Sequence, residues 1–162
     1  MSNFTKYKLD DFEETNDSVL IGIVSSAPDY NICWHINKLL QLKLYRCDDI
    51  KIELASKVKK SPVIDLFSAE LADETEPQNF SMHHAFKFID EQFYSEYYLI
   101  SNKGTQGYLE NSLKKVNYFF EINGVKSENH EQLIFELNTI EPIELAYFIR
   151  SESLISKFQI AI

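Results

Sequence analysis

The sequence predicts a single α+β domain, with a mostly antiparallel sheet of five to six strands and two main helices packed on it. A chain of 162 residues, 44% of them hydrophobic, is large enough to bury one sizeable core. Strand-like runs cluster between two helical patterns, and this order is typical of an antiparallel sheet with its helices on one face. We expect the domain to span residues 1–162, with 1–17 as a ragged N-terminal segment that includes a short strand over residues 6–9.

The next part of the chain predicts a strand–helix–strand unit with short links. Residues 19–26 are apolar and β-branched, which favours a central strand. Residues 30–40 give the clearest helix, because apolar residues recur three or four positions apart and Pro28 suits a first turn. Asn37 lies beside the apolar stripe, and we expect its amide to bond neighbouring backbone. A second strand is expected over residues 42–45.

The middle of the chain is less regular and then returns to strands. Residues 51–77 have no clear period, although residues 63–67 favour a strand and residues 71–79 are typical of an acidic, exposed loop. Residues 85–89 and 97–101 predict two strands that a longer loop joins as a hairpin.

The last part of the chain predicts a third meander strand, a helix and a final strand. Residues 116–122 favour the strand, and the Asn-Gly pair at 123–124 ends it because that dipeptide favours positive φ. Residues 127–138 predict the second main helix, and residues 143–149 predict the last strand. A short C-terminal helix is expected over residues 151–158.

The acidic composition excludes several classes of partner. A net charge of −9 repels nucleic-acid phosphates and anionic lipid surfaces, so we expect neither nucleic acid nor a membrane as partner. No run approaches the roughly 20 apolar residues of a membrane-spanning helix, and the N-terminus lacks the apolar region of a signal peptide. Cys33 and Cys47 match no zinc or redox spacing and fit a reducing compartment. We therefore expect a cytoplasmic protein.

The common catalytic and cofactor motifs are missing from the sequence. It has no Gly-rich phosphate loop in a strand–loop–helix context and no nucleophile elbow. His83 and His84 are adjacent, so on a strand they point to opposite faces and do not easily share a metal. Lys114 and Lys115 are typical of a solvated strand end. We expect no catalytic residue, no metal and no cofactor, and the balance is against an enzyme.

One group of polar and aromatic residues is the best candidate for a ligand-binding site. These residues lie where the first strand meets the first helix and where the second strand ends. Paired carboxylates there could bind a cation or act as acid and base, or they could pair with the neighbouring arginine and cap a turn. The candidate ligand-binding residues are Asp29, Tyr30, Trp34, Arg46, Asp48 and Asp49.

Three segments resemble those of a small bacterial family of unknown function, the IPExxxVDY family. Residues 29–37, DYNICWHIN, are similar to a family helix that begins Asp-Tyr and contains a central Trp and a final Asn. Residues 97–103, YYLISNK, are similar to its tyrosine-rich strand and Asn-Lys turn, and residues 110–118, ENSLKKVNY, lie where the naming motif is expected. The resemblance implies one full-length domain and supplies no activity.

The naming motif is only half retained. The tripeptide at 110–112 replaces Ile-Pro-Glu and Asn117 replaces Asp, whereas Val116 and Tyr118 fit. Either the motif is structural, or this member has lost an activity that depended on those carboxylates. We favour a structural motif, because an Ile-Pro pair followed by a Val-Asp-Tyr strand looks like a loop locked ahead of a strand.

The sequence therefore favours a non-enzymatic protein-interaction module, with an unknown protein partner or a second copy of the chain as a homodimer. Its 9 Tyr, 12 Phe and 1 Trp supply residue types that commonly anchor interfaces. The alternative is a small-ligand-binding protein or enzyme that uses the six candidate residues. An exposed aromatic patch supports the first hypothesis, and polar groups that converge on an apolar pocket support the second.

Overall fold

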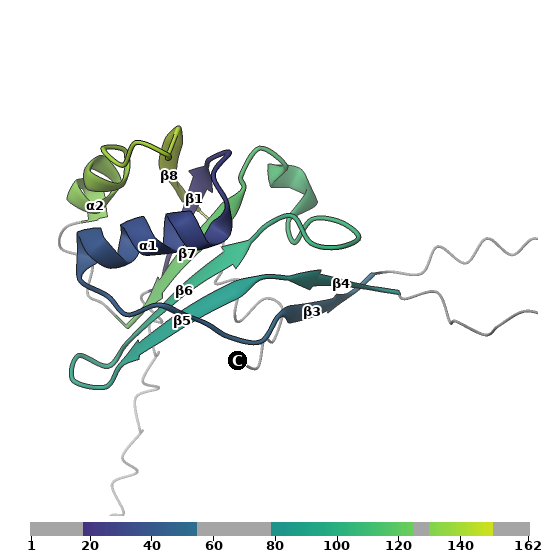
Figure 1. Cartoon of the computed structure of the whole chain (residues 1–162), viewed down its shortest axis with the longest axis horizontal. Coiled ribbons are helices and arrows are strands. Elements are labelled where there is room, and N and C mark those ends of the chain that lie inside the picture. The colour runs from purple at the N-terminus through teal and green to yellow at the C-terminus, as the bar shows by residue number, and fades with distance from the viewer. Residues whose placement is uncertain (1–17, 55–78, 125–129, 151–162) are drawn as a thin grey trace, which may run out of the picture.

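A computed structural model describes residues 18–54, 79–124 and 130–150. The strands are β1 (Ser18–Val24), β2 (Tyr45–Arg46), β3 (Ile50–Glu53), β4 (Phe80–His83), β5 (Ala85–Asp90), β6 (Ser95–Ser101), β7 (Tyr118–Asn123) and β8 (Leu145–Ile149). Six of them form an antiparallel sheet in the order β2-β5-β6-β7-β1-β8, while β3 and β4 pair separately beyond the start of β5 (Figure 1). The described part of the chain is thus built around one sheet, and the predicted α+β class is confirmed.

Two α-helices, α1 (Asp29–Leu40) and α2 (His130–Leu137), cover one face of the six-stranded sheet (Figure 1). Strand residues that point to this face alternate with residues that point away, as the period of two in a strand requires. Ile21 and Phe120 from the central strands, Ile32 and Ile36 from α1, and Leu137 from α2 share one buried apolar cluster. The predicted placement of both helices on one face is therefore confirmed.

The opposite face of the sheet carries a second buried cluster. Leu20, Ile100 and Phe119 point to this side and pack with Ile50 of β3 and Val116, which follows the short 3₁₀ helix η1 (Asn111–Leu113). Within the described residues this face is therefore covered by short irregular elements instead of α-helices.

Strand directions explain why both helices lie on the same face. Four antiparallel steps separate β1 from β2, and two separate β7 from β8, so each helix connects a pair of parallel strands. The β1–α1–β2 crossover moves across the sheet towards the β2 edge, and the β7–α2–β8 crossover moves towards the β8 edge. The starting strands β1 and β7 are antiparallel, so both the strand direction and the direction across the sheet are reversed between the two crossovers. Two crossovers of the same hand then place their helices on one face.

In each crossover, an asparagine in the last turn of the helix or just after it bonds the backbone of the chain that follows, at the edge of the sheet. The Asn37 amide donates to the Leu44 carbonyl at 3.0 Å, and its oxygen accepts from the Leu44 N–H at 2.8 Å. Asn138 makes the same pair of bonds to the carbonyl and N–H of Ala146, both at 2.9 Å. These side chains take the place that a neighbouring strand would occupy at the two sheet edges. The predicted backbone role of Asn37 is confirmed.

Most of the predicted elements occur in the structure with shifted ends. The central strand, the first helix, the hairpin of residues 85–101 and the sharp stop after Asn123 are confirmed, and Gly124 has the expected positive φ of 83°. The third meander strand and the last strand each begin two residues later than predicted, and the second helix is described over His130–Leu137. The predictions over residues 6–9, 63–67 and 151–158 lie outside the described residues.

One predicted strand at the edge of the main sheet was wrong, and the small two-stranded sheet was not predicted. The strand expected over residues 42–45 is instead the two-residue β2, because Asn37 occupies the backbone groups of Leu44. Strands β3 and β4 were not predicted, although the IKIE sequence of β3 alternates apolar and charged residues as a half-buried strand does.

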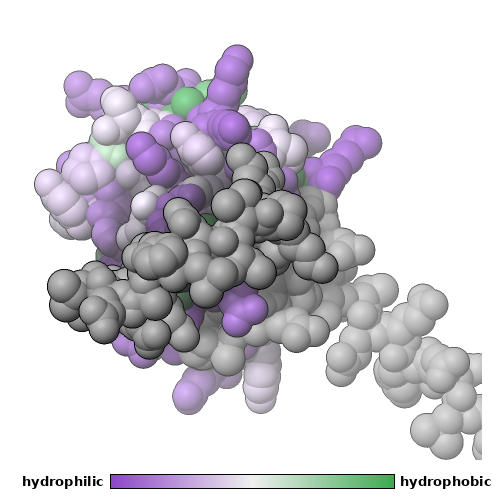
Figure 2. All heavy atoms as spheres, turned by 90° about the vertical axis from the view of Figure 1, so that its right-hand side faces the viewer, coloured by the Kyte–Doolittle hydropathy of each residue, from purple (hydrophilic) through white to green (hydrophobic). Residues whose placement is uncertain are grey.

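The helices and surface add two further findings. No described helix has the length and apolar content needed to cross a lipid bilayer. Where Figure 2 shows described residues on one side of the molecule, most of them are hydrophilic, with few hydrophobic side chains between them. Among described residues, the exposed large aromatic side chains include those of Tyr30, Trp34 and Tyr94.

Candidate functional site

Asp29, the first residue of α1, ties the helix to the link between β4 and β5. Its Oδ2 lies 2.6 Å from Nδ1 of His84, and its Oδ1 accepts a hydrogen bond from the Tyr30 amide at 2.7 Å. A carboxylate is stabilised at this position by the positive end of the helix dipole. Both oxygens of Asp29 therefore have partners within the protein.

The link from β1 to α1 is held by residues of the segment that resembles the family motif. The Ser25 amide donates to Oδ1 of Asn117 at 2.9 Å, and the Tyr118 hydroxyl donates to the Ala27 carbonyl at 2.6 Å. Burial, with a smaller contribution from Asp29, raises the pKa of Tyr118 to about 12, so the phenol stays a donor at neutral pH. These contacts fix the start of α1, and they favour a structural interpretation of the motif.

The other half of that segment also makes backbone contacts. Glu110 accepts from both the amide and the hydroxyl of Ser112, at 3.2 and 2.7 Å, at the start of η1. Asn102 is fully buried, and its amide donates to the carbonyls of Leu113 and Val116, both at 2.9 Å. Asn102 thus organises this loop, and it is the asparagine of the Asn-Lys turn in residues 97–103.

A β-bulge follows β2 on the edge of the sheet. Arg46 pairs with Phe86, whereas Ile50 pairs with His83. Residues 47–49 therefore lie opposite residues 84–85, which is one residue more than a regular pairing allows. An extra residue of this kind bends the strand and redirects its side chains. The bulge contains Asp48 and Asp49, two of the predicted site residues.

Arg46 closes the bulge through contacts within its own neighbourhood. Its guanidinium forms an ion pair with Asp49 and donates to the Ala85 carbonyl at 3.1 Å. It also lies 5.6 Å from the centre of the Phe86 ring, in a cation–π arrangement. The pairing with Arg46 that the sequence left open for the two aspartates therefore occurs for Asp49, while Asp48 is exposed.

Tyr30 and Trp34 lie one turn apart on α1 and point to solvent. They are 68% and 56% exposed, respectively. Lys38 lies 5.1 Å from the centre of the Trp34 ring, and the His35 ring meets it edge-on at 4.8 Å. The apolar face of α1 is buried elsewhere, so these two rings form an outward aromatic pair that folding does not require.

Among the six predicted residues, the described contacts form two pairs that involve three of them. Asp29 pairs with His84, Arg46 pairs with Asp49, and the aromatic side chains face outward. Two hollows of the described surface, one beside the β5–β6 turn and one beside η1, include none of the six. Among described residues no group of three or more His, Cys, Asp and Glu side chains has a metal-binding arrangement. Of the six residues, Tyr30 and Trp34 carry large side chains that are exposed at the described surface.

His84 is the site residue that sequence reasoning missed. In the sequence it stands out only as half of a histidine pair, and the prediction that the pair points to opposite faces is correct, since His83 is fully buried and His84 is exposed. An imidazole beside a carboxylate can act as a general base. Within the described part of the chain, however, no serine, threonine or cysteine bonds to His84.

Comparison with known proteins adds no family. No protein-family model matches the chain, and no curated protein matches it. The resemblance to the IPExxxVDY family therefore stays a prediction, and function has to be argued from the geometry alone.

Proposed function

We propose that this protein is a non-enzymatic interaction module and that the exposed face of α1 is a contact surface. The observation that carries the proposal is the Tyr30–Trp34 pair, which stays more than half exposed on a helix that buries its other face. Tyr and Trp are the residue types that most often dominate binding energy, because each buries a large rigid area and keeps one polar group.

The surroundings of the aromatic pair support contact with a protein. Lys38 stacked on Trp34 and the Asp29–His84 pair give the patch a polar rim, as protein interfaces commonly have. Because this rim is already paired internally, binding does not require a charge to be stripped of water without a partner. We further propose a cytoplasmic location, because the described cysteines, Cys33 and Cys47, are free thiols.

The test is a pull-down from native cell lysate with three forms of the full chain. Proteins that bind the wild type should be lost with the double variant Tyr30→Ala/Trp34→Ala. The matched control is Phe135→Ala, which removes an equally exposed ring from α2 and should retain them. Equal retention by both variants would contradict the proposal, and light scattering of the purified forms identifies the case in which the partner is a second copy.

The alternative function, a ligand-binding protein or enzyme, has one supporting observation in the Asp29–His84 contact. If that pair binds or activates a small molecule, His84→Gln should abolish a metabolite that co-purifies with the wild type. If the pair is structural, the same change should lower only the free energy of unfolding.

A further inference from the structure

The turn between β5 and β6 displays aromatic side chains at a second place on the surface. Phe93 and Tyr94 in the turn are 67% and 86% exposed, and Ile89 near the end of β5 is also exposed. None of these side chains contributes to either buried cluster. Their exposure is therefore not a by-product of core packing.

The backbone of this turn is held in a conformation that a tyrosine rarely adopts. Tyr94 has a φ of 52°, in the left-handed region that glycine or asparagine usually occupies. Asp90 stabilises the turn, because its Oδ1 accepts from the amides of Gln92 and Phe93 at 3.0 and 3.3 Å. The chain thus tolerates local strain at Tyr94 while the ring gains almost no burial, a combination that points to a role outside folding.

The end of β7 is fitted closely against the same turn. Gly124 has a φ of 83°, and a Cβ atom there would lie 2.3 Å from the Tyr94 carbonyl oxygen. Only glycine allows this approach, so β7 supports the turn directly and fixes where the Tyr94 ring is presented.

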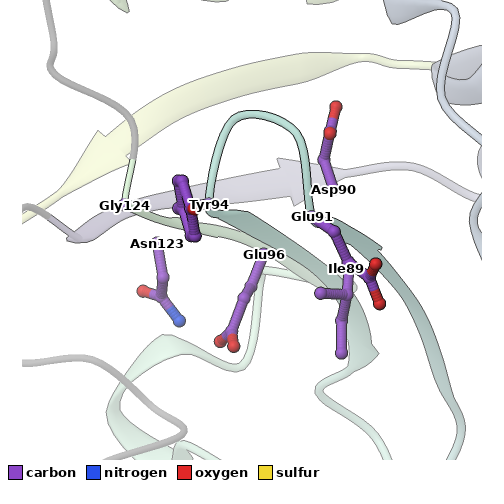
Figure 3. A pocket seen from close by; sticks show the side chains of 7 residues that line it. All are labelled: Ile89, Asp90, Glu91, Tyr94, Glu96, Asn123 and Gly124. Atoms are coloured by element: carbon purple, nitrogen blue, oxygen red, sulfur yellow. The ribbon is translucent and has the colours of Figure 1, made fainter.

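Beside the turn lies an open hollow of about 670 Å³ (Figure 3). Ile89, Glu96 and Asn123 lie next to one another across three strands on the face opposite the helices. The side chains of Glu96 and Asn123 point the same way from neighbouring strands, with Tyr94 beside them (Figure 3). Glu91 completes an acidic rim.

The charged groups of this hollow are the carboxylates of Asp90, Glu91 and Glu96, and no basic side chain is among the described residues that line it. The Oδ1 atom of Asn123 is buried and has no hydrogen-bond partner. Carboxylates and the face of a tyrosine ring both attract ammonium and guanidinium groups. Although Glu96 already accepts a hydrogen bond from the Tyr98 hydroxyl at 2.9 Å, the negative charge of the hollow is complementary to a cationic donor.

We propose that the β5–β6 turn and this hollow bind a lysine- or arginine-bearing segment of a partner protein. The inference rests on the proposed function as an interaction module but concerns a surface distinct from the face of α1. Charge complementarity selects the occupant, since the whole chain carries −9. Residues 1–17 carry two lysines and five carboxylates, so this segment adds negative charge and is a poorer complement than a basic partner.

The first test measures binding of a fluorescein-labelled octa-arginine peptide to the full chain at physiological salt by fluorescence anisotropy. Glu91→Gln/Glu96→Gln should weaken binding about tenfold or more, because two charge-assisted contacts are lost. The control Glu131→Gln/Glu144→Gln removes the same charge from exposed residues of α2 and the β8 end, and should change affinity less than about twofold. Equal losses in the two variants, or no binding by the wild type, would overturn the proposal.

A second variant separates binding from folding. Tyr94→Gly removes the ring and also relieves the positive φ, so its melting temperature should be no lower than that of the wild type. Its affinity for octa-arginine should nevertheless fall several-fold, as expected for a lost cation–π contact. Full affinity in Tyr94→Gly would contradict the proposal.

The remaining controls distinguish this proposal from its alternatives. The variant Tyr30→Ala/Trp34→Ala should bind octa-arginine with wild-type affinity. If this variant loses binding while the variants of the β5–β6 turn keep it, the turn is not the binding site, and the proposed contact surface on α1 is unaffected. If lysate partners survive Tyr30→Ala/Trp34→Ala, the proposed function fails instead. A rise in affinity in Lys6→Gln/Lys8→Gln would show that the chain's own segment fills the hollow, which overturns a partner as the occupant.

Discussion

The two edges of the main sheet use the same device under different conditions. At the β2 edge Asn37 bonds both backbone groups of Leu44, and at the β8 edge Asn138 bonds both groups of Ala146. Asn37 is half-buried and lies in a packed corner, whereas Asn138 is exposed to water. The same two hydrogen bonds should therefore stabilise the two edges to different extents, because water can replace lost partners only at the exposed one.

The edges also differ in how much strand is left beyond the asparagine. β2 has two residues and then enters the bulge closed by Arg46. β8 has five residues, and Phe148, two residues after Ala146, directs its backbone groups to the same outer side. At the β2 edge, both the bulge and the Asn37 side chain prevent further strand pairing. At the β8 edge, the Asn138 side chain has the larger share of this role.

The largest expected effect is loss of stability on removing Asn37. We expect Asn37→Ala to lower the free energy of unfolding by about 2 to 3 kcal/mol and Asn138→Ala by about 1 kcal/mol, since buried unsatisfied backbone groups cost more than hydrated ones. Urea denaturation measures both. Asn111→Ala, an exposed asparagine in η1, is the control and should stay within about 0.5 kcal/mol of the wild type. Equal losses at the two edges would break the comparison.

Acid should weaken the β2 side of the sheet through His83. Burial lowers the pKa of His83 below its ordinary value of 6.5, while its Nδ1 lies 3.0 Å from the Ser101 carbonyl oxygen. The unfolded chain therefore binds a proton at a higher pH than the folded protein does. Stability should fall as the pH drops below about 6.5, by at most about 1.4 kcal/mol per pH unit, until His83 itself protonates.

The measurement is urea denaturation between pH 5 and 7.5 for the wild type and His83→Gln. The pH dependence should become flatter in the variant, whatever its absolute stability. Amide hydrogen exchange in the wild type should quicken first in β4 and β5 rather than in β8 as the pH falls. If the free energy of unfolding of His83→Gln depends on pH as steeply as that of the wild type, His83 does not make the β2 side more sensitive to acid than the β8 side.

Thiol reactivity offers a smaller and local readout of the β2 edge. Burial, helped by Asp29, raises the pKa of Cys33 to about 11, and burial also raises that of Cys47. Cys47 is the more exposed of the two and should react first with iodoacetamide. Asn37→Ala should speed alkylation of Cys33 several-fold because it loosens the adjacent corner, whereas Asn138→Ala should not. Mass spectrometry of timed samples tests this, and equal acceleration in both variants would count against it.

The smallest expected effect concerns self-association. Opening an apolar edge strand creates a template for pairing with another chain. Asn138→Ala should therefore shift towards dimers at high concentration relative to the wild type, whereas Asn37→Ala should not, since β2 is too short to pair. Light scattering across a concentration series measures the fraction of dimer. Dimer formation by Asn37→Ala alone would show that the β2 edge, and not the β8 edge, is the one that needs protection.

The parts of this fold that the sequence predicted are those in which pattern and environment agree. The apolar run of β1 and the helical spacing of α1 each match one buried face, so local periodicity was sufficient. The edge could not be predicted in the same way, because the end of β2 depends on Asn37, whose bonds to Leu44 form only once the helix has folded back. Strands β3 and β4 escaped because each is four residues long and their partners are distant in the chain.

The candidate site likewise contains residues that local sequence singles out and partners that only the tertiary structure reveals. Asp29 and Asp49 can be singled out in the sequence by residue type, but their partners follow from tertiary structure. His84 reaches Asp29 from the link between β4 and β5, and Asp49 pairs with Arg46 within the bulge. The exposure of Tyr94 was equally hidden, because a tyrosine in a strand-rich region is ordinarily part of the core. Only its left-handed φ and its neighbour Gly124 single it out.

The central position of β1 has a consequence for how the chain is made. β1 is synthesised early, yet both of its neighbours come late: Ser18 pairs with Asn123 in β7, and Leu20 pairs with Ile149 in β8. At a synthesis rate of roughly 5 to 20 residues per second, this apolar strand waits on the order of 5 to 20 seconds for its first partner. The β5–β6 hairpin can form locally during that time, whereas the sheet cannot close until translation of the domain is nearly complete. Closure of the sheet should therefore wait for synthesis of β8, and β1 has no strand partner until β7 has been made.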